Sequence, residues 1–323
     1  MISKKRIILI VTGIIVIFFL VYNYTRIEDI DDIKEEKYIS FLVTSEDERN
    51  HSLNTRTFEY SFEMQQINLK STLPYYAQYP LSVYDMDNDC IYYSHRDESQ
   101  CDQLYQYNLN TKKNIKLTNN LFAINYIFPI EDSVYLGAVY KNKREITLLK
   151  YENGELTQLL ENDDLFVQNI NYNPDTHMIV FNTYSNTEAE KRFEEYDINP
   201  NRPLTGDNTI WSLDITNKDG VPQKKDVVGE GDIAYICSDE KDNIYYYQEG
   251  KHYILEGKDG LIKENAAFDE LKIYNPVYIT NKDVYYIKDS RSIIKYNSST
   301  KKNETLYEIS EDKSIINSAI ILD

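Results

Sequence analysis

Short apolar runs alternate with polar turns along most of the chain, and their order repeats. Residues 282–297, KDVYYIKDSRSIIKYN, show the pattern: a polar turn, a strand of Val or Ile with aromatics, a polar loop, and a second strand ending at Tyr-Asn. A tight turn and a third strand follow. Five such units place an aliphatic residue at the same position, at spacings of 43, 45, 65 and 40 residues: Ile91, Val134, Ile179, Ile244 and Val284.

One further apolar run precedes the turn of each unit, which makes four strands per unit. These runs are YPLSVYDM, AINYIFPI, LFVQNINY, DIAYICS and IYNPVYIT. Repeats of about 40 to 50 residues with four short strands are typical of β-propeller blades. The runs are almost continuously apolar, as expected where stacked blades cover both faces of each sheet.

The two ends of the repeat region complete a sixth unit. Residues 38–45 and 57–70 supply strands without a leading one, whereas residues 317–323, NSAIILD, form a leading strand without followers. Pairing the two ends would hide the last open sheet edges. The sequence therefore predicts an all-β, six-bladed β-propeller over residues 38–323, with a first blade built from both ends of the domain.

Two segments resemble the repeats of known propeller families. NPDTHMIVF, residues 173–181, and VYYIKDSRSIIKYN, residues 284–297, are similar to repeats of TolB-like and YWTD-like six-bladed propellers. The resemblance is architectural and covers residues 38–323, although most units lack the Asp-Gly turn of those repeats. It implies the fold but no single activity, because this superfamily contains carriers, receptors and enzymes.

The N-terminus differs in composition from the repeats. A basic cluster at Lys4, Lys5 and Arg6 precedes an uncharged apolar run over residues 7–22. A membrane-spanning helix needs about 17 to 25 residues, and flanking Lys, Arg and Tyr side chains can extend a slightly short run. No A-x-A-like cleavage site follows, which favours an uncleaved signal anchor over a removed signal peptide.

These features predict three regions and a location. Residues 1–24 form a basic cap and transmembrane anchor, residues 25–37 a charged stalk, and residues 38–323 the propeller. The positive-inside rule places the N-terminus in the cytoplasm and the propeller outside, in a bacterial cell envelope. We therefore expect a single-pass protein of the cell membrane.

The net charge of the chain limits the kinds of partner that it is expected to bind. It is −18 for the whole chain, and residues 1–24 contribute only cations. Phosphate backbones would be repelled, and the sequence shows no extended basic face, which excludes nucleic acid as an expected partner. An envelope protein, a peptide or another surface ligand remains open.

Neither a disulfide framework nor a metal site is expected. Cys90 and Cys101 flank one predicted hairpin, but its register places Cys101 opposite Ser94 or His95. No CxxC or paired-His spacing occurs. The acidic run DMDND, residues 85–89, lacks the Gly and Glu that complete a calcium loop, so turn chemistry is favoured over a bound cation. No cofactor is predicted.

Catalytic motifs are missing from the sequence, and blades, stalk and anchor account for the whole chain. A hydrolase or lyase with its active site in the central channel remains the alternative to a binding module. His51, His95 and His252 fall in or beside loops between second and third strands, on one face, whereas His177 lies on the other. Surface histidines are the favoured interpretation of all four, and a general base among them would need a carboxylate partner.

Two long loops point to a binding face. The first and fourth units carry expanded loops between their second and third strands, and these units lie opposite each other in a six-bladed ring. The fourth loop begins with helix-capping residues and supplies aromatic and Arg side chains common at interfaces: Arg192, Phe193, Tyr196, Arg202 and Pro203. We expect this loop to contact a partner, with a plug across the ring or a tolerated insertion as alternatives.

Overall fold

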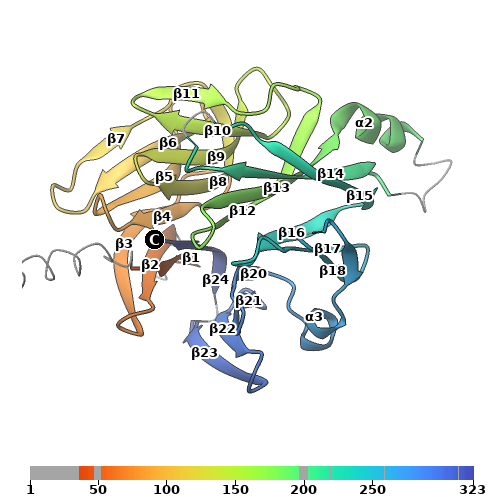
Figure 1. Cartoon of the computed structure of the whole chain (residues 1–323). Helices are drawn as coiled ribbons and strands as arrows, with labels where there is room; N and C mark the ends of the chain where they lie inside the picture. The colour runs from red at the N-terminus through yellow and green to blue at the C-terminus, as the bar shows by residue number, and fades with distance from the viewer. Residues whose placement is uncertain (1–35, 47–51, 196–202, 218–219, 258, 312) are drawn as a thin grey trace, which may run out of the picture. The chain divides into compact units, whose positions relative to one another are not determined.

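The computed structural model describes residues 36–46, 52–195, 203–217, 220–257, 259–311 and 313–323. Its described strands lie in one compact unit, Lys37–Asp323, as six four-stranded antiparallel sheets. Figure 1 shows these sheets, with labels on most of their strands. The predicted all-β, six-bladed propeller is confirmed.

In each of the first three blades, four strands follow one another from the axis outward. They are β24 (Ser314–Leu322), β1 (Tyr38–Glu46), β2 (Leu53–Ser61) and β3 (Gln66–Pro74) in blade 1; β4 (Ser82–Asp85), β5 (Cys90–Arg96), β6 (Asp102–Asn108) and β7 (Asn114–Lys116) in blade 2; and β8 (Leu121–Ile130), β9 (Ser133–Tyr140), β10 (Thr147–Glu152) and β11 (Glu155–Gln158) in blade 3.

The last three blades follow the same order. They are β12 (Leu165–Asn173), β13 (Met178–Ser185), β14 (Asp207–Asp214) and β15 (Gln223–Glu230) in blade 4; β16 (Ile233–Ser238), β17 (Ile244–Gln248), β18 (Lys251–Leu255) and β19 (Ile262–Glu264) in blade 5; and β20 (Pro276–Ile279), β21 (Asp283–Lys288), β22 (Ser292–Asn297) and β23 (Lys302–Glu308) in blade 6. The five aliphatic residues that marked the repeat each fall at the start of a second strand.

The ring closes through both ends of the domain, as the sequence predicts. β24 pairs antiparallel with β1, with Tyr38 opposite Leu322 and Ile39 opposite Ile321. Figure 1 shows dark blue β24 beside the red end of the colour range at β1. Sequence-distant strands therefore complete blade 1, and β24 covers the inner edge of β1.

Apolar and tyrosine side chains fill the layers between blades. Inner strands such as β4 are buried at every position, whereas the outermost β7 and β19 are exposed throughout. Tyr38, Tyr172 and Tyr246 are among the largest fully buried side chains. Fully burying one large apolar side chain stabilises a fold by about 1.5–3 kcal/mol, so these layers dominate its stability.

The strand order gives the propeller two different faces. The "loop face" carries the loops between second and third strands and the connections from each blade to the next. The "turn face" carries the other two turns of every blade, together with the start of β1 and the end of β24. The chain thus enters and leaves the propeller on the turn face.

Both described helices lie on the loop face. α2 (Asn186–Glu194) joins β13 to β14, as the helix-capping residues at the start of the fourth loop indicated, and Ser185 caps it. α3 (Ala266–Leu271) joins β19 to β20 and was not predicted. In Figure 1, α2 lies at the far ends of β13 and β14.

The predicted anchor, residues 1–24, and the stalk up to residue 35 lie outside the described residues. Within the described part of the chain, no helix has the length and apolarity to cross a membrane.

All three cysteines are free thiols, in agreement with the expected lack of a disulfide. The predicted hairpin register was nevertheless wrong. Ser94 and His95 pair with Leu104 and Gln103, while Cys101 lies beside Asp97. The turn is centred on Ser99, later in the chain than expected, and the Asp97 carboxylate closes it by accepting a hydrogen bond from the Ser99 backbone amide at 2.9 Å.

Candidate functional site

Every exposed aromatic side chain of the described residues lies on the loop face. Their exposed fractions are 61% for Tyr76, 45% for Tyr79, 46% for Phe122, 70% for Phe193 and 49% for Tyr274. They come from the β3–β4 connection, the start of β8, helix α2 and the α3–β20 connection. Exposed apolar area gathered on one face marks an interaction surface more often than single scattered residues do.

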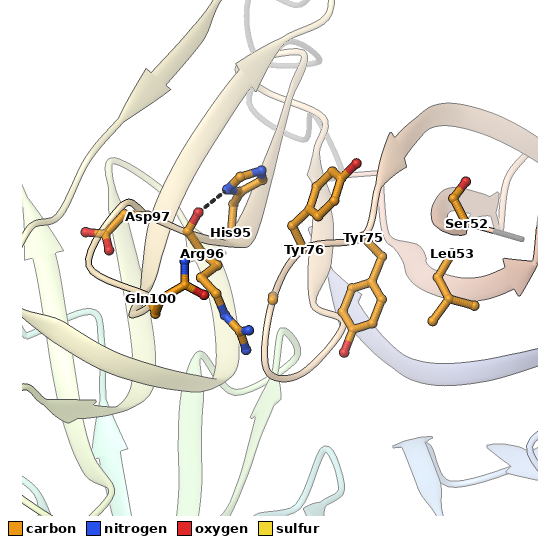
Figure 2. Close-up of a pocket in the computed structure, with 9 residues that line it drawn as sticks. Ser52, Leu53, Tyr75, Tyr76, His95, Arg96, Asp97 and Gln100 are labelled. Carbon is orange, nitrogen blue, oxygen red and sulfur yellow. Dashed lines mark hydrogen bonds between the residues drawn. The ribbon is translucent and has the colours of Figure 1, made fainter. Parts of the chain in front are cut away.

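A hollow of about 700 Å³ opens on this face between blades 1 and 2. Figure 2 shows Tyr76 between Leu53 on one side and His95 on the other, with Asp97 and Gln100 at the β5–β6 turn. Both the β3–β4 connection and a second-to-third-strand loop therefore contribute to it. Both apolar and polar side chains line the hollow, as they do in many small binding sites.

His95 is held in this hollow by the backbone of Arg96 and by aromatic rings. Its Nδ1 lies 2.7 Å from the Arg96 carbonyl oxygen. Because a carbonyl only accepts, Nδ1 donates, and the neutral ring leaves Nε2 as an acceptor. The rings of Tyr76, Tyr93 and Tyr105 surround it at centroid distances of 5.3 to 6.1 Å. No described carboxylate hydrogen-bonds to His95, so it lacks the partner of a general base.

Asp97 places a negative charge at the edge of the hollow. The side-chain hydrogen bond from Ser99, and then the one from Lys116, hold the pKa of its carboxyl well below the usual range. Lys116 lies 2.9 Å from the carboxylate, and Lys141 of the neighbouring blade lies 3.8 Å away. The β5–β6 turn is thereby linked to blade 3.

The structure buries His252 completely, beneath exposed Tyr274. Its Nδ1 contacts the Asp269 carboxylate, and its Nε2 lies 2.8 Å from the Ile273 carbonyl oxygen. Both ring nitrogens therefore have a hydrogen-bond partner within the fold. Because both nitrogens have these partners, His252 links α3 to blade 5, and neither ring nitrogen is available to a ligand.

Arg192 is 5% exposed and holds the fourth-unit loop together. Its guanidinium donates to Glu188 in α2, to Glu230 in β15 at 2.8 Å, and to the carbonyl oxygens of Pro203 and Thr205. The hydrogen bond to Glu230 contributes most to raising its pKa. Arg192 therefore positions the loop, and its neighbour Phe193 is the side chain that reaches solvent.

The N-terminus of α2 is fixed by the connection between blades 3 and 4. Asp164 accepts hydrogen bonds from the Thr187 backbone amide at 2.8 Å and from the hydroxyls of Thr187 and Ser185, and these bonds lower its pKa. Ser185 in turn accepts from the Glu188 amide at 3.1 Å. The described polar contacts of α2 thus go to blades 3 and 4, and the helix presents Phe193 from a fixed position.

Other predicted candidates have different outcomes. His51, Tyr196 and Arg202 lie outside the described residues and stay predictions. His177 lies on the turn face as expected, 3.9 Å from Asp323. In the acidic run at residues 85–89, the Asp85 carboxylate accepts from the Asn88 amide groups, which is turn chemistry. The described residues contain no cluster of three or more metal-ligating side chains.

The sequence reasoning missed most of the exposed aromatics. One signal was available: residues 74–80, PYYAQYP, place three tyrosines between two prolines, in a connection rather than in a strand. Proline restricts strand formation, so tyrosines in such a segment are displayed on a loop rather than packed between sheets.

Comparison with known proteins identifies the class by fold. No model of a known protein family and no curated protein matches the sequence. The chain is similar to a crystal structure of a nidogen/laminin complex, with a TM-score of 0.54 and 10% identity over 88% of this chain and 98% of that one. It is also similar to TolB from Acinetobacter baumannii, with a TM-score of 0.55 and 12% identity over 88% and 67%. The protein therefore has the fold of a six-bladed β-propeller, similar to the fold of these two structures.

Proposed function

We propose that this protein is a membrane-anchored, extracytoplasmic module that binds a protein partner through its loop face. The observation that carries the proposal is the gathering of all exposed aromatic side chains of the described residues on that face. Aromatic residues are enriched in the centres of protein interfaces, where a few of them supply most of the binding energy.

The topology supports the same arrangement. β1 begins and β24 ends on the turn face, so an anchor and stalk preceding Lys37 would join the propeller there. The loop face lies at the opposite ends of the strands and stays open to a partner. The nidogen of similar fold was crystallised in complex with laminin, another protein. For this acidic chain we expect an envelope protein or peptide as partner.

The described histidines give little support to catalysis in the central channel. His95 contacts backbone and rings, and His252 is buried with both nitrogens occupied. At the axis, the hydroxyl of Tyr172 from blade 4 donates to Asp323 of blade 1 at 3.2 Å, so the two opposite blades meet there. A binding function accounts better for these contacts.

Cross-linking in intact envelopes, followed by purification of the full-length protein, tests the proposal. The triple variant Tyr76→Ala, Phe122→Ala, Phe193→Ala should capture the partner at least about tenfold less, which corresponds to about 1.4 kcal/mol. A matched control removes exposed apolar residues away from the loop face: Met64→Ala, Leu69→Ala and Val221→Ala. Equal capture by the two variants would rule out the loop face.

The anchor has its own test. Mass spectrometry of the protein purified from membranes should find residues 1–24 still attached, because no cleavage site follows the apolar run. A mature N-terminus beyond Thr25 would show that the propeller is released.

A further inference from the structure

A second hollow on the loop face differs from the rest of the molecule in charge. It has a volume of about 400 Å³ and lies over blades 2 and 3. Tyr79 comes from the β3–β4 connection, Phe122 from the start of β8, and three cations from the β9–β10 loop: Lys141, Lys143 and Arg144. No Asp or Glu lines it, although the chain has 53 acidic residues against 35 Lys and Arg.

The three cations differ in the hydrogen bonds and ion pairs that they form with the rest of the protein. Lys141 donates to the Ser99 hydroxyl at 3.0 Å and lies 3.8 Å from Asp97, and Lys143 pairs with Asp163. Arg144 is exposed and forms no ion pair with any described residue. Its guanidinium is therefore available to a ligand, with five donors in a geometry that matches a carboxylate.

Two aromatic side chains lie beside these cations. Tyr79 and Phe122 are 45% and 46% exposed, so each offers about half its surface to a ligand. A group that fills this hollow would bring an apolar side chain against the rings and a negative charge against Arg144. Burial of the apolar part would also lower the local dielectric and strengthen the charge contact.

We infer that this basic hollow binds an acidic peptide segment of the partner, with a Glu or Asp carboxylate on Arg144 and an adjacent aliphatic side chain between Tyr79 and Phe122. Charge complementarity selects the carboxylate, since the hollow is a local cationic site on an acidic protein. The net charge of −18 disfavours an extended polyanion, which would also meet the surrounding negative surface. The inference rests on the proposed binding function and specifies the ligand chemistry of one part of the loop face.

The test uses the full-length protein and labelled peptides in which Glu alternates with Leu, Gln with Leu, or Glu with Ser. Fluorescence anisotropy should show binding of the Glu/Leu peptide alone, weakened by added salt because the charge contact is partly exposed. Arg144→Gln should reduce affinity at least about fivefold and Phe122→Ser about tenfold. Lys191→Gln, which removes an exposed cation of α2 on the same face, should change affinity less than about twofold.

Several results would overturn the inference. They are equal binding of the Glu/Leu and Gln/Leu peptides, equal effects of Arg144→Gln and Lys191→Gln, no binding at millimolar peptide, or preferential binding of a single-stranded oligonucleotide. Thermal melts verify that each variant is folded. If the inference fails while the aromatic triple variant still loses its partner in envelopes, the proposed function stands with a different ligand chemistry. If that triple variant keeps its partner, the proposed function itself fails.

Discussion

The two faces of this propeller are made from the same repeat but use their polar and aromatic groups differently. On the turn face, polar groups bind one another: Asp175 of blade 4 contacts Lys37 of blade 1 and accepts from the Tyr278 hydroxyl of blade 6. On the loop face, aromatic rings such as Phe193 point to solvent and hollows lie between the loops. The two faces thus differ in their exposed aromatic area, and under the proposed function the loop face is the one available for recognition.

The difference has a physical origin in the connections. Most turns of the turn face are short and closed by Asp or Asn side chains, as where Asp239 accepts from the Asn243 amide and the Tyr245 hydroxyl. The loop face holds the blade-to-blade connections and the helices, which vary in length. Variation of loops on a rigid scaffold allows recognition to change without changing the sheets.

The largest expected effect is at the closure of blade 1. Deleting residues 317–323 removes most of β24, including Ile321 and Leu322, each 1% exposed. We expect a loss of more than about 5 kcal/mol of stability, or no cooperative folding, because buried contacts and the edge pairing of β1 are lost together. Thermal and denaturant unfolding measure this, with deletion of Asp323 alone as the control. An unchanged midpoint would contradict a blade closed by both ends.

Alkaline pH should destabilise the fold through its buried tyrosines, because burial opposes their ionisation in the native state. Burial raises the pKa of Tyr126, Tyr135 and Tyr184 to about 12, from 10.0. Burial, and then the bond to Asp175, raises that of Tyr278 on the turn face. Because the folded pKa values are raised, their contribution to stability is complete below pH 10 and falls as pH rises through the folded values.

Each such tyrosine should lower stability by about 1.4 kcal/mol per pH unit above 10. Unfolding followed by circular dichroism and by tyrosinate absorbance should therefore show a cooperative alkaline transition. Gradual ionisation without unfolding would mean that the buried rings are accessible in the native state.

Replacing Arg192 tests whether stabilising contacts also occur on the loop face, because its guanidinium is hydrogen-bonded within the fold there. Arg192→Ala leaves Glu188, Glu230 and two carbonyl oxygens without their donor and should cost about 2 kcal/mol. Lys191→Ala, its exposed neighbour, should change stability by less than about 0.5 kcal/mol. Denaturant melts compare the two, and equal effects would refute the positioning role.

The smallest expected effect concerns the attachment of α2. Asp164→Asn should lower the melting temperature slightly at pH 7, because the carboxylate accepts from Thr187 and Ser185. Since hydrogen bonds lower the folded pKa of Asp164, its contribution is present above its ordinary value of 3.8 and is lost as pH falls below it. The difference between variant and wild type should therefore shrink with acidification. A difference that persists at low pH would point to a packing defect.

The blades were predictable because apolar periodicity repeats locally. Ile91 and Val284 lie in different blades yet occupy the same strand position, and the cap before α2 was recognisable from adjacent residues. Contacts such as Tyr278 with Asp175 were not predictable, since 103 residues separate them and many acidic residues would serve equally. The cations at Lys141 and Arg144 were visible as KNKR, but only the fold brings them beside Tyr79 and Phe122.

The pairing of β1 with both β2 and β24 also determines how the propeller would respond to mechanical tension. A pull on Lys37 against a partner held on the loop face acts along β1, parallel to the strand and across its ladders with both neighbours. The hydrogen bonds of this nine-residue strand would then be loaded together, in shear, rather than opened one after another. Because β1 is paired on both sides, its N-terminal end should resist force, and under the proposed anchoring and binding a strained complex should part at the loop face before the ring opens.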